Sequence, residues 1–266
     1  MAHFYKHYYR FLFDDYRLSD NRLCSRIHDH YKRKGSFAIK KHVRSTDVVI
    51  DLGCGGGWTL LPYHKAGFEY YGFDYDETYI EFGKQHYNLN LFVGGVEKAL
   101  KMNLKANYVS LNHVLEHTND PVTFLTSLKP ILKKNAIINI SVPSLDFIWT
   151  GGGGSSTTLM GTLQLAHTVL FDSFTLNYTA KKAGFDVIHN FGGNIMITPS
   201  KSSNNTIEIS KNRGKKVLNK LLLLEKSAPI RNWLIPTPLK QKAHYINYLF
   251  SLGKALQKFK LIKFGL

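Results

Sequence analysis

The sequence has little cysteine, few acidic residues and no long hydrophobic run. Its two cysteines, Cys24 and Cys54, cannot build a disulfide framework, and neither belongs to a CxxC metal motif. No run of about 18 apolar residues occurs, so the sequence predicts no membrane-spanning helix. Residues 1–10 are aromatic and basic and lack the apolar core of a secretory signal. These absences argue against a disulfide-rich secreted protein and predict a cytoplasmic location.

The shortage of acidic residues is concentrated at the carboxyl-terminal end. The chain holds 35 Lys and Arg against 19 Asp and Glu, a formal net charge of +16. Residues 201–266 hold 14 basic and 2 acidic residues, whereas residues 1–200 hold 21 and 17. Most of the positive charge therefore lies in the last quarter of the chain, which predicts a separate electrostatic role for that extension.

Glycine, by contrast, is abundant at one place. Residues 47–57 read Asp-Val-Val-Ile-Asp-Leu-Gly-Cys-Gly-Gly-Gly. The apolar residues predict a short buried parallel strand, and the glycines allow a tight turn close to a ligand. Residues 58–66 then predict a helix. A strand, a glycine loop and a helix in this order indicate a nucleotide site, with a purely structural glycine turn as the alternative.

Two acidic residues indicate the kind of nucleotide. Trp58 occupies the third glycine position of a dinucleotide fingerprint. Asp51, two residues before Gly53, would repel a pyrophosphate but suits a cationic ligand such as S-adenosylmethionine. Asp74 ends the next predicted strand, about twenty residues further on, where it can accept hydrogen bonds from both ribose hydroxyls. These features predict a site for S-adenosyl-L-methionine.

The order of the motifs resembles the class I S-adenosylmethionine-dependent methyltransferases, specifically the bacterial small-molecule and glycan methyltransferase-domain group. The resemblance runs from about residue 47 to residue 200. It rests on the glycine loop 51–57, on Gly72-Phe-Asp74, on residues 110–117 followed by Asp120-Pro121, on the fifth-strand region 128–143, and on His167, Phe171, Phe174 and Leu176 followed by Ala183-Gly-Phe185.

The resemblance also implies which residues hold the cofactor. Gly94-Gly95 stands where the family often has Gly-Asp to catch the adenine amino group, so adenine would depend on backbone groups near Val96 and on Glu97. Asn107 replaces the usual Asp that opens the fourth strand. The predicted cofactor-binding residues are Asp51, Gly53, Cys54, Gly55, Asp74, Tyr75, Gly95, Val96, Glu97 and Asn112.

Methyl transfer to a hydroxyl needs an acceptor of its proton near the methyl group. Three histidines lie on segments predicted to face the ligand, namely His113, His117 and His167. His117 and His167 match motifs of the family, and histidine is partly neutral near pH 7. Each of the three has a structural role as its alternative. Glu116 is interpreted as a brace of its loop, and no metal site is predicted.

Strands and helices alternate in a rhythm that predicts an α/β fold. We expect a doubly wound, Rossmann-like sheet of seven strands, mostly parallel with the last strand antiparallel. A helical cap (1–45) precedes a methyltransferase domain (46–200), and residues 143–172 predict a flexible lid over the acceptor or, alternatively, a surface excursion. The expected elements are 47–52, 58–66, 69–74, 77–86, 90–93, 107–112, 121–132, 136–142, 173–183, 185–189 and 194–198.

The extension 201–266 is basic, amphipathic and aromatic at once. Residues 242–264 place apolar side chains roughly on one helical face, with lysines around it. This pattern favours a peripheral helix on an anionic membrane surface, here the inner face of the cell membrane. Packing on the domain and a dimer arm are alternatives. Nucleic acid is disfavoured because the basic residues alternate with Leu, Ile and Phe.

The leading prediction is an S-adenosylmethionine-dependent methyltransferase that O-methylates a sugar or sugar-linked intermediate of surface glycan biosynthesis. The acceptor class rests on the resemblance alone. The first alternative is a lipid or quinone-type acceptor delivered by the extension. A nucleic-acid methyltransferase and a non-catalytic cofactor-binding subunit follow. The oligomeric state is left open.

Overall fold

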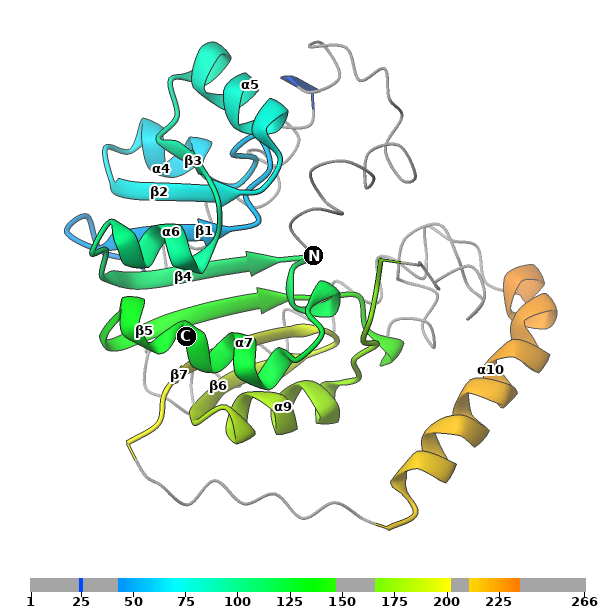
Figure 1. Cartoon of the computed structure of the whole chain (residues 1–266). Coiled ribbons are helices and arrows are strands. Elements are labelled where there is room, and N and C mark those ends of the chain that lie inside the picture. The colour runs from blue at the N-terminus through cyan, green and yellow to red at the C-terminus, as the bar shows by residue number, and fades with distance from the viewer. Residues whose placement is uncertain (1–23, 26–42, 147–165, 202–210, 235–266) are drawn as a thin grey trace, which may run out of the picture. The chain divides into compact units, whose positions relative to one another are not determined.

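The computed structural model describes residues 24–25, 43–146, 166–201 and 211–234 (Figure 1). Most of the predicted cap, the centre of the predicted lid and the predicted helix 242–264 lie outside these ranges, and those expectations stay predictions. The chain divides into two compact units, residues 1–140 and 141–266. The division falls inside the predicted methyltransferase domain, at the end of its fifth strand.

Seven strands of the described residues form a sheet in the order β3-β2-β1-β4-β5-β7-β6. β1 pairs in parallel with β2 and β4, and β2 with β3, whereas β6 and β7 are antiparallel. A central β1 flanked by β2 and β4 is the order of a doubly wound sheet, so the predicted fold class is confirmed. The strands span Val48–Leu52 (β1), Glu69–Asp74 (β2), Leu91–Val93 (β3), Ala106–Asn112 (β4), Leu132–Ser141 (β5), Phe185–Phe191 (β6) and Asn194–Pro199 (β7).

The strands of the first unit end at a common edge. Leu52 of β1 pairs with Phe73 of β2 and with Leu111 of β4. Every residue of β1 is buried, as expected for a central parallel strand covered on both faces. The loops that follow β1, β2 and β4 therefore emerge side by side. The strand order reverses between β1 and β4, and this is where open α/β sheets bind their ligands.

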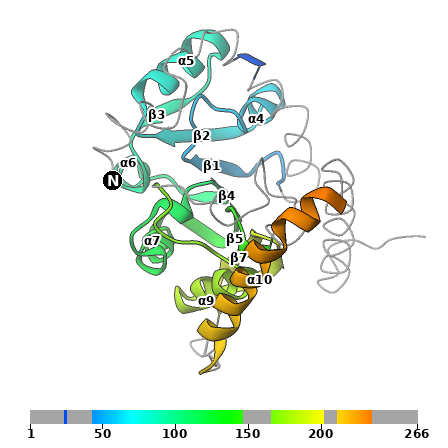
Figure 2. The same cartoon turned by 90° about the vertical axis from the view of Figure 1, so that its right-hand side faces the viewer.

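Helices cover both faces of the strands in the first unit. α6 and α7 lie on one face and α4 on the opposite face, as the two perpendicular views agree (Figures 1 and 2). Asp76 starts α5 by accepting hydrogen bonds from two backbone N–H groups of its first turn. The helices span Leu61–Lys65 (α4), Glu77–Tyr87 (α5), Val96–Lys101 (α6) and Pro121–Ser127 (α7), with 3-10 turns at Leu115–His117 and Lys129–Ile131.

Two expected helices are shorter than predicted, and a proline explains each. The helix expected over 58–66 begins only at Leu61, because Pro62 favours the first turn of a helix and residues 55–60 form turns. The helix expected over 121–132 ends at Ser127, since Pro130 cannot donate a backbone hydrogen bond to continue it. Consequently β5 begins at Leu132, four residues earlier than expected.

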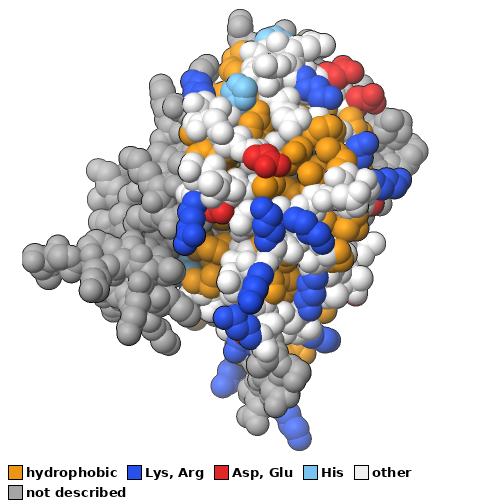
Figure 3. Space-filling model, turned by 90° about the vertical axis from the view of Figure 1, so that its left-hand side faces the viewer, with side chains coloured by type: hydrophobic (Ala, Val, Ile, Leu, Met, Phe, Trp, Pro, Cys, Tyr) orange, Lys and Arg blue, Asp and Glu red, His pale blue; other side chains and the backbone are white. Residues whose placement is uncertain are grey.

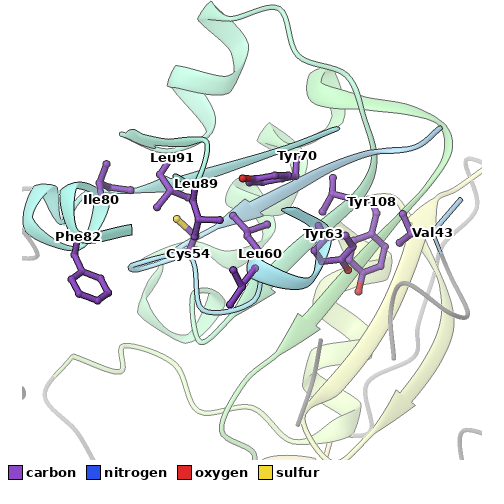
Figure 4. Close-up of a cluster of buried hydrophobic side chains, with 12 residues drawn as sticks. Val43, Cys54, Leu60, Tyr63, Tyr70, Ile80, Phe82, Leu89, Leu91 and Tyr108 are labelled. Carbon is purple, nitrogen blue, oxygen red and sulfur yellow. The ribbon is translucent and has the colours of Figure 1, made fainter. Parts of the chain in front are cut away.

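A hydrophobic cluster of the first unit lies between β1, β2 and the helices that follow them (Figure 4). Cys54 of the glycine loop belongs to it and is 1% exposed. Burial, together with the nearby carboxylates of Asp74 and Asp51, raises the pKa of the Cys54 thiol well above its usual value. Cys54 is therefore a packing residue of this cluster as well as a residue of the glycine loop. The other buried members are Val43, Val49, Leu60, Leu61, Tyr63, Tyr70, Ile80, Phe82, Leu89, Leu91 and Tyr108.

In the second unit the ends of the predicted lid are held together. Ser144 forms a parallel bridge with Phe171, and the N–H of Leu145 donates to the carbonyl of Phe171 at 2.8 Å. The carboxylate of Asp146 accepts hydrogen bonds from the backbone N–H and the hydroxyl of Ser173, at 2.8 and 2.6 Å. The chain therefore leaves and returns at one place, which is what either a lid or a surface excursion requires.

The second unit also contains helices α9 (Ser173–Lys182) and α10 (Arg213–Leu234). Asp172 and Thr175 form a capping box at the start of α9. The guanidinium of Arg213, at the first residue of α10, forms an ion pair with the same Asp172. It also lies 3.7 Å from the ring centre of Phe174. These contacts hold the start of α10 against the start of α9.

The described surface carries more basic than acidic side chains. Figure 3 shows Lys and Arg spread between hydrophobic side chains on one face, with few acids among them. On α10, Leu218, Leu222 and Leu223 are more than half exposed. Among the described helices, none is both long and apolar enough to cross a membrane.

Candidate active site

A cavity of about 950 Å³ lies beyond the carboxyl ends of β1, β2 and β4 in the first unit. Its size is within the range of small-molecule sites. Its lining combines three kinds of group, which are the glycine loop, carboxylates at the strand ends, and histidines after β4. All ten residues predicted to bind the cofactor line this cavity. Of the three predicted bases, His113 and His117 line it as well.

The glycine loop is fastened to the end of β2. The N–H groups of Gly53 and Cys54 both donate to the carbonyl of Phe73, at 2.8 and 3.1 Å. Gly53 has a φ of +74°, and a Cβ there would collide with the side chain of Val114. Gly55 has a φ of +54°, and a Cβ there would collide with the indole of Trp58. A left-handed backbone in such close contact accepts only glycine at both positions.

Two carboxylates line the cavity at the ends of β1 and β2. Asp51 is 1% exposed and accepts a hydrogen bond from the Thr59 hydroxyl. Asp74 accepts one backbone N–H on each oxygen, from Gly55 at 2.8 Å and from Asp76 at 2.9 Å. Burial raises the pKa of Asp74, and these two hydrogen bonds oppose the rise. Each oxygen of Asp74 keeps lone-pair capacity for a further donor.

A third carboxylate, Glu97, stands at the rim of the cavity. It accepts hydrogen bonds from the Tyr75 hydroxyl at 3.0 Å and from the Gly95 N–H at 2.8 Å. Burial, followed by the charge of Glu97, raises the pKa of Tyr75 to about 12, so this hydroxyl stays protonated and donates at neutral pH. A Cβ on Gly95 would press against the Tyr75 hydroxyl at 2.6 Å, so glycine is needed for this arrangement. Sequence reasoning placed these residues at the site but not their mutual contacts.

The segment after β4 brings two histidines and a buried carboxylate together. Glu116 is 1% exposed. Its Oε1 lies 3.2 Å from Nδ1 of His113 and 3.9 Å from Nε2 of His117. The His113 side chain is 58% exposed, whereas that of His117 is 10% exposed. His113 has a φ of +55°, a left-handed conformation that costs a non-glycine residue about 1–2 kcal/mol.

The other predicted groups take up different positions. Asn112 lines the cavity and donates its side-chain N–H to the Ser110 hydroxyl at 2.9 Å. Asp120 starts α7 by accepting from the N–H groups of Val122 and Thr123. His167 belongs to the second unit, where it is half-buried in the irregular stretch before Phe171, and its role as a base stays a prediction.

Sequence reasoning missed several lining residues. Trp58 and Tyr79 pack edge to face, with ring centres 5.4 Å apart, on the side of the glycine loop. Thr59 contributes the hydroxyl that holds Asp51. One signal was available for Thr59, because a hydroxyl eight residues after a buried acid can fold back once a glycine turn intervenes. Further lining residues are Val114, Thr118, Asn119, Thr123, Phe124 and Ser127.

Comparison with curated proteins finds two relatives over limited stretches. Both are named ubiquinone biosynthesis O-methyltransferase. The protein from Haemophilus ducreyi is 28% identical over 103 residues, covering 35% of this chain and 44% of that protein. The protein from Pelagibacter ubique is 31% identical over 109 residues, covering 37% of this chain and 45% of that protein. The chain thus spans less than half the length of either relative.

Comparison with solved structures supports the fold. A chain of the Haloferax volcanii complex between the Trm112 methyltransferase activator and a methyltransferase matches with a TM-score of 0.51. The identity is 17%, and the match covers 63% of this chain and 74% of that one. The methyltransferase-domain family matches residues 17–190, well over half of the chain. The glycine loop, the strand-end carboxylates and the cavity they line therefore stand in a chain that belongs to the methyltransferase-domain family, with S-adenosyl-L-methionine as its cofactor.

Proposed function

We propose that this methyltransferase methylates a hydroxyl oxygen of a hydrophobic, ring-containing small molecule. One observation carries the proposal. A single cavity is lined both by the carboxylates suited to the cofactor and by histidines suited to accepting a proton. Hydroxyl acceptors need a base during methyl transfer. A cavity with both groups therefore fits O-methylation.

The residues at the strand ends fit S-adenosyl-L-methionine. The carboxylates of Asp51, Asp74 and Glu97 offer acceptors to a cationic ligand that also carries ribose hydroxyls and an adenine amino group. When bound, this cofactor supplies a methyl group activated on a sulfonium. Asp74 would accept from the ribose and Glu97 from adenine. The backbone N–H groups around Gly95 and Val96, and the side chain of Asn112, complete the predicted cofactor contacts.

The rest of the cavity suits an acceptor. Phe124, Val114 and Leu100 offer apolar contacts, and Thr123 and Ser127 offer hydroxyls. Most of the chemistry in methyl transfer is holding the acceptor oxygen in line with the methyl carbon, so a shaped and partly apolar wall contributes directly. Histidine then takes the hydroxyl proton, with His113, His117 and His167 as candidates.

The choice of a ring-type acceptor rests on two supports. The relatives named above act in ubiquinone biosynthesis by name, although only part of each is matched. The basic extension, with leucines exposed on α10, suits a protein that meets its acceptor at an anionic membrane surface. A sugar-linked acceptor, favoured by the sequence resemblance, gains no support from either observation. It becomes an outcome of the test.

The test is methyl transfer by the full chain from radiolabelled S-adenosylmethionine to three sets of acceptors. These are water-soluble catechols, phenols carrying an isoprenoid or alkyl chain, and nucleotide sugars. We expect labelled product from ring hydroxyls, more from those with an apolar chain, and none from an O-methylated control ring. Label on nucleotide sugars alone would overturn the ring-type acceptor. No label on any acceptor, with cofactor binding intact, would argue for a non-catalytic cofactor-binding protein.

A further inference from the structure

We propose that His113 is the base and that Glu116 is a positioning residue that fixes its tautomer. The proposal rests on the O-methyl transfer proposed above and assigns the proton-accepting role to one of three candidates. Glu116 was interpreted from sequence only as a brace of its loop. The contacts of its carboxylate give it a more specific task.

The position of Glu116 is unusual for a carboxylate. The side chain is 1% exposed, and a buried charge is costly unless polar partners compensate it. One carboxylate oxygen, Oε1, faces a ring nitrogen of His113 at 3.2 Å and a ring nitrogen of His117 at 3.9 Å. The first distance is that of a hydrogen bond, whereas the second is too long for one. Glu116 therefore holds His113 more directly than His117.

The two histidines differ in which nitrogen they turn to Glu116. His113 presents Nδ1, so Nδ1–H donates to the carboxylate and Nε2, the distal nitrogen, keeps its lone pair. His117 presents Nε2 and is 10% exposed, against 58% for His113. The exposure difference decides between them, because an acceptor molecule has to reach the nitrogen that takes its proton. His113 has both a ring nitrogen with a lone pair and an exposed side chain that an acceptor molecule can reach.

The backbone supports the same assignment. His113 adopts a φ of +55°, and it directly follows Asn112, the last residue of β4 and a lining residue of the cavity. Strained residues persist where the surroundings over-determine them, and they cluster at functional sites. With this backbone conformation, the imidazole of His113 contacts the buried Glu116 and also lines the cavity.

The resulting chemistry balances without a further reactant. The acceptor oxygen forms a bond to the methyl carbon as the bond between that carbon and the sulfonium sulfur breaks. The hydroxyl proton passes to Nε2 of His113. The imidazolium then carries a proton on each nitrogen, and the Nδ1–H bond to Glu116 stabilises its charge. Solvent removes the proton from the exposed ring after product leaves.

The tautomer of His113 tests the pair without any acceptor. In the full chain with bound S-adenosylhomocysteine and ¹⁵N-labelled histidine, NMR distinguishes Nδ1–H from Nε2–H rings. The His113 signal is identified by its loss in His113→Asn, a variant chosen because asparagine tolerates a left-handed backbone. We expect the Nδ1–H form in the native protein and a mixture in Glu116→Gln, whose amide can either accept or donate. A predominant Nε2–H form in the native protein would overturn the proposal.

Kinetics with the best acceptor of the panel adds a second reading. His113→Asn should lower kcat by about 100-fold or more, and Glu116→Gln by about 10-fold, with S-adenosylhomocysteine affinity within about twofold of native. The double variant should be no slower than His113→Asn, because Glu116 acts through His113. His86→Gln, an exposed histidine of α5 outside the cavity, is the control.

Two outcomes would assign the residues differently. Additive losses in the double variant would mean that Glu116 acts independently of His113. Turnover lost in EDTA and restored by Zn²⁺ or Mg²⁺ would show that Glu116 and its neighbouring histidines bind a metal ion, in place of the proposed base. If no acceptor in the panel is methylated, the proposed function fails, while the tautomer measurement still decides whether Glu116 positions His113.

Discussion

The cavity of the first unit and helix α10 of the second unit are built on opposite principles. Around the cavity, acidic side chains are held by hydrogen bonds, as with the two backbone N–H groups that Asp74 accepts. On α10, basic side chains such as Lys215 and Lys216 are exposed beside exposed leucines. The ion pair and ring contact of Arg213 link the start of α10 to α9.

The difference indicates two modes of recognition. A site whose groups are fixed before binding loses little order when a small ligand arrives, so it can discriminate one ligand from its isosteres. A helix with exposed lysines and leucines selects a surface by charge and apolar burial, without fixed geometry. Substitutions in the two regions should therefore differ in what they change and in their dependence on salt.

The largest effect is expected at Asp74. Asp74→Asn should weaken S-adenosylhomocysteine binding by about 100-fold, the sum of two lost hydrogen bonds to a charged group at about 1.5 kcal/mol each. Isothermal titration calorimetry measures it, and Glu81→Gln on the exposed face of α5 is the control with the same charge change. The native protein should gain thermal stability from this ligand and none from NAD. Equal affinity in Asp74→Asn would remove Asp74 from the cofactor site.

A smaller effect is expected on α10. Lys215→Gln together with Lys216→Gln should weaken partition to anionic vesicles by about 30-fold, since each basic residue near such a surface contributes about 1 kcal/mol. Co-sedimentation with phosphatidylserine vesicles at low and high salt measures it. Lys101→Gln with Lys105→Gln makes the same change of net charge on exposed lysines of the first unit. Equal losses in both pairs would show a net-charge effect and not a docking helix.

Arg213→Ala should destabilise the second unit by about 1–2 kcal/mol, because it removes an ion pair that is mostly shielded from solvent and the contact with Phe174. Denaturant unfolding gives the size of the loss. Hydrogen exchange should increase in the first turns of α9 and α10. Lys211→Ala, an exposed basic residue two positions earlier, is the control. If exchange in α10 stays unchanged, the helix is held by other contacts.

The smallest effect concerns pH. Burial lowers the pKa of His189 in β6, so the folded protein favours its neutral form. The unfolded chain takes up the proton more readily, and the stability associated with His189 is full above about pH 6.5 and is lost as the pH falls through that value. Melting temperatures from about pH 7.5 to 5.5 should fall less steeply in His189→Gln than in the native protein. Parallel slopes would contradict this assignment.

Much of the fold could be predicted because its signals are local. Apolar runs that lead to Asp51 and Asp74 predicted the positions of β1 and β2. The order of the motifs along the chain predicted the type of sheet. Boundaries were less predictable where a proline ends a helix within an otherwise apolar stretch, as at Pro130. α10 is the reverse case, since it continues through Pro229, a residue that usually interrupts helices.

The site was predictable as a set of residues but not as a set of contacts. Sequence spacing was enough to place Asp51, Asp74 and the glycine loop at one cavity. The left-handed backbone of His113 has no such signal in the sequence. The 58% exposure of the His113 side chain is likewise a property of the folded chain and not of its sequence spacing. The Tyr75 and Glu97 pair is 22 residues apart, and only folding brings it together.

The reactivity of the Cys54 thiol offers a measure of how often the glycine loop opens. This thiol is 1% exposed and burial raises its pKa, so a thiol reagent can reach it only when the loop opens. Cys24→Ser leaves Cys54 as the last thiol of the chain, because there are two cysteines. The rate of its labelling then reports the opening equilibrium of the loop, and a ligand that closes the loop slows the reaction in proportion to its occupancy.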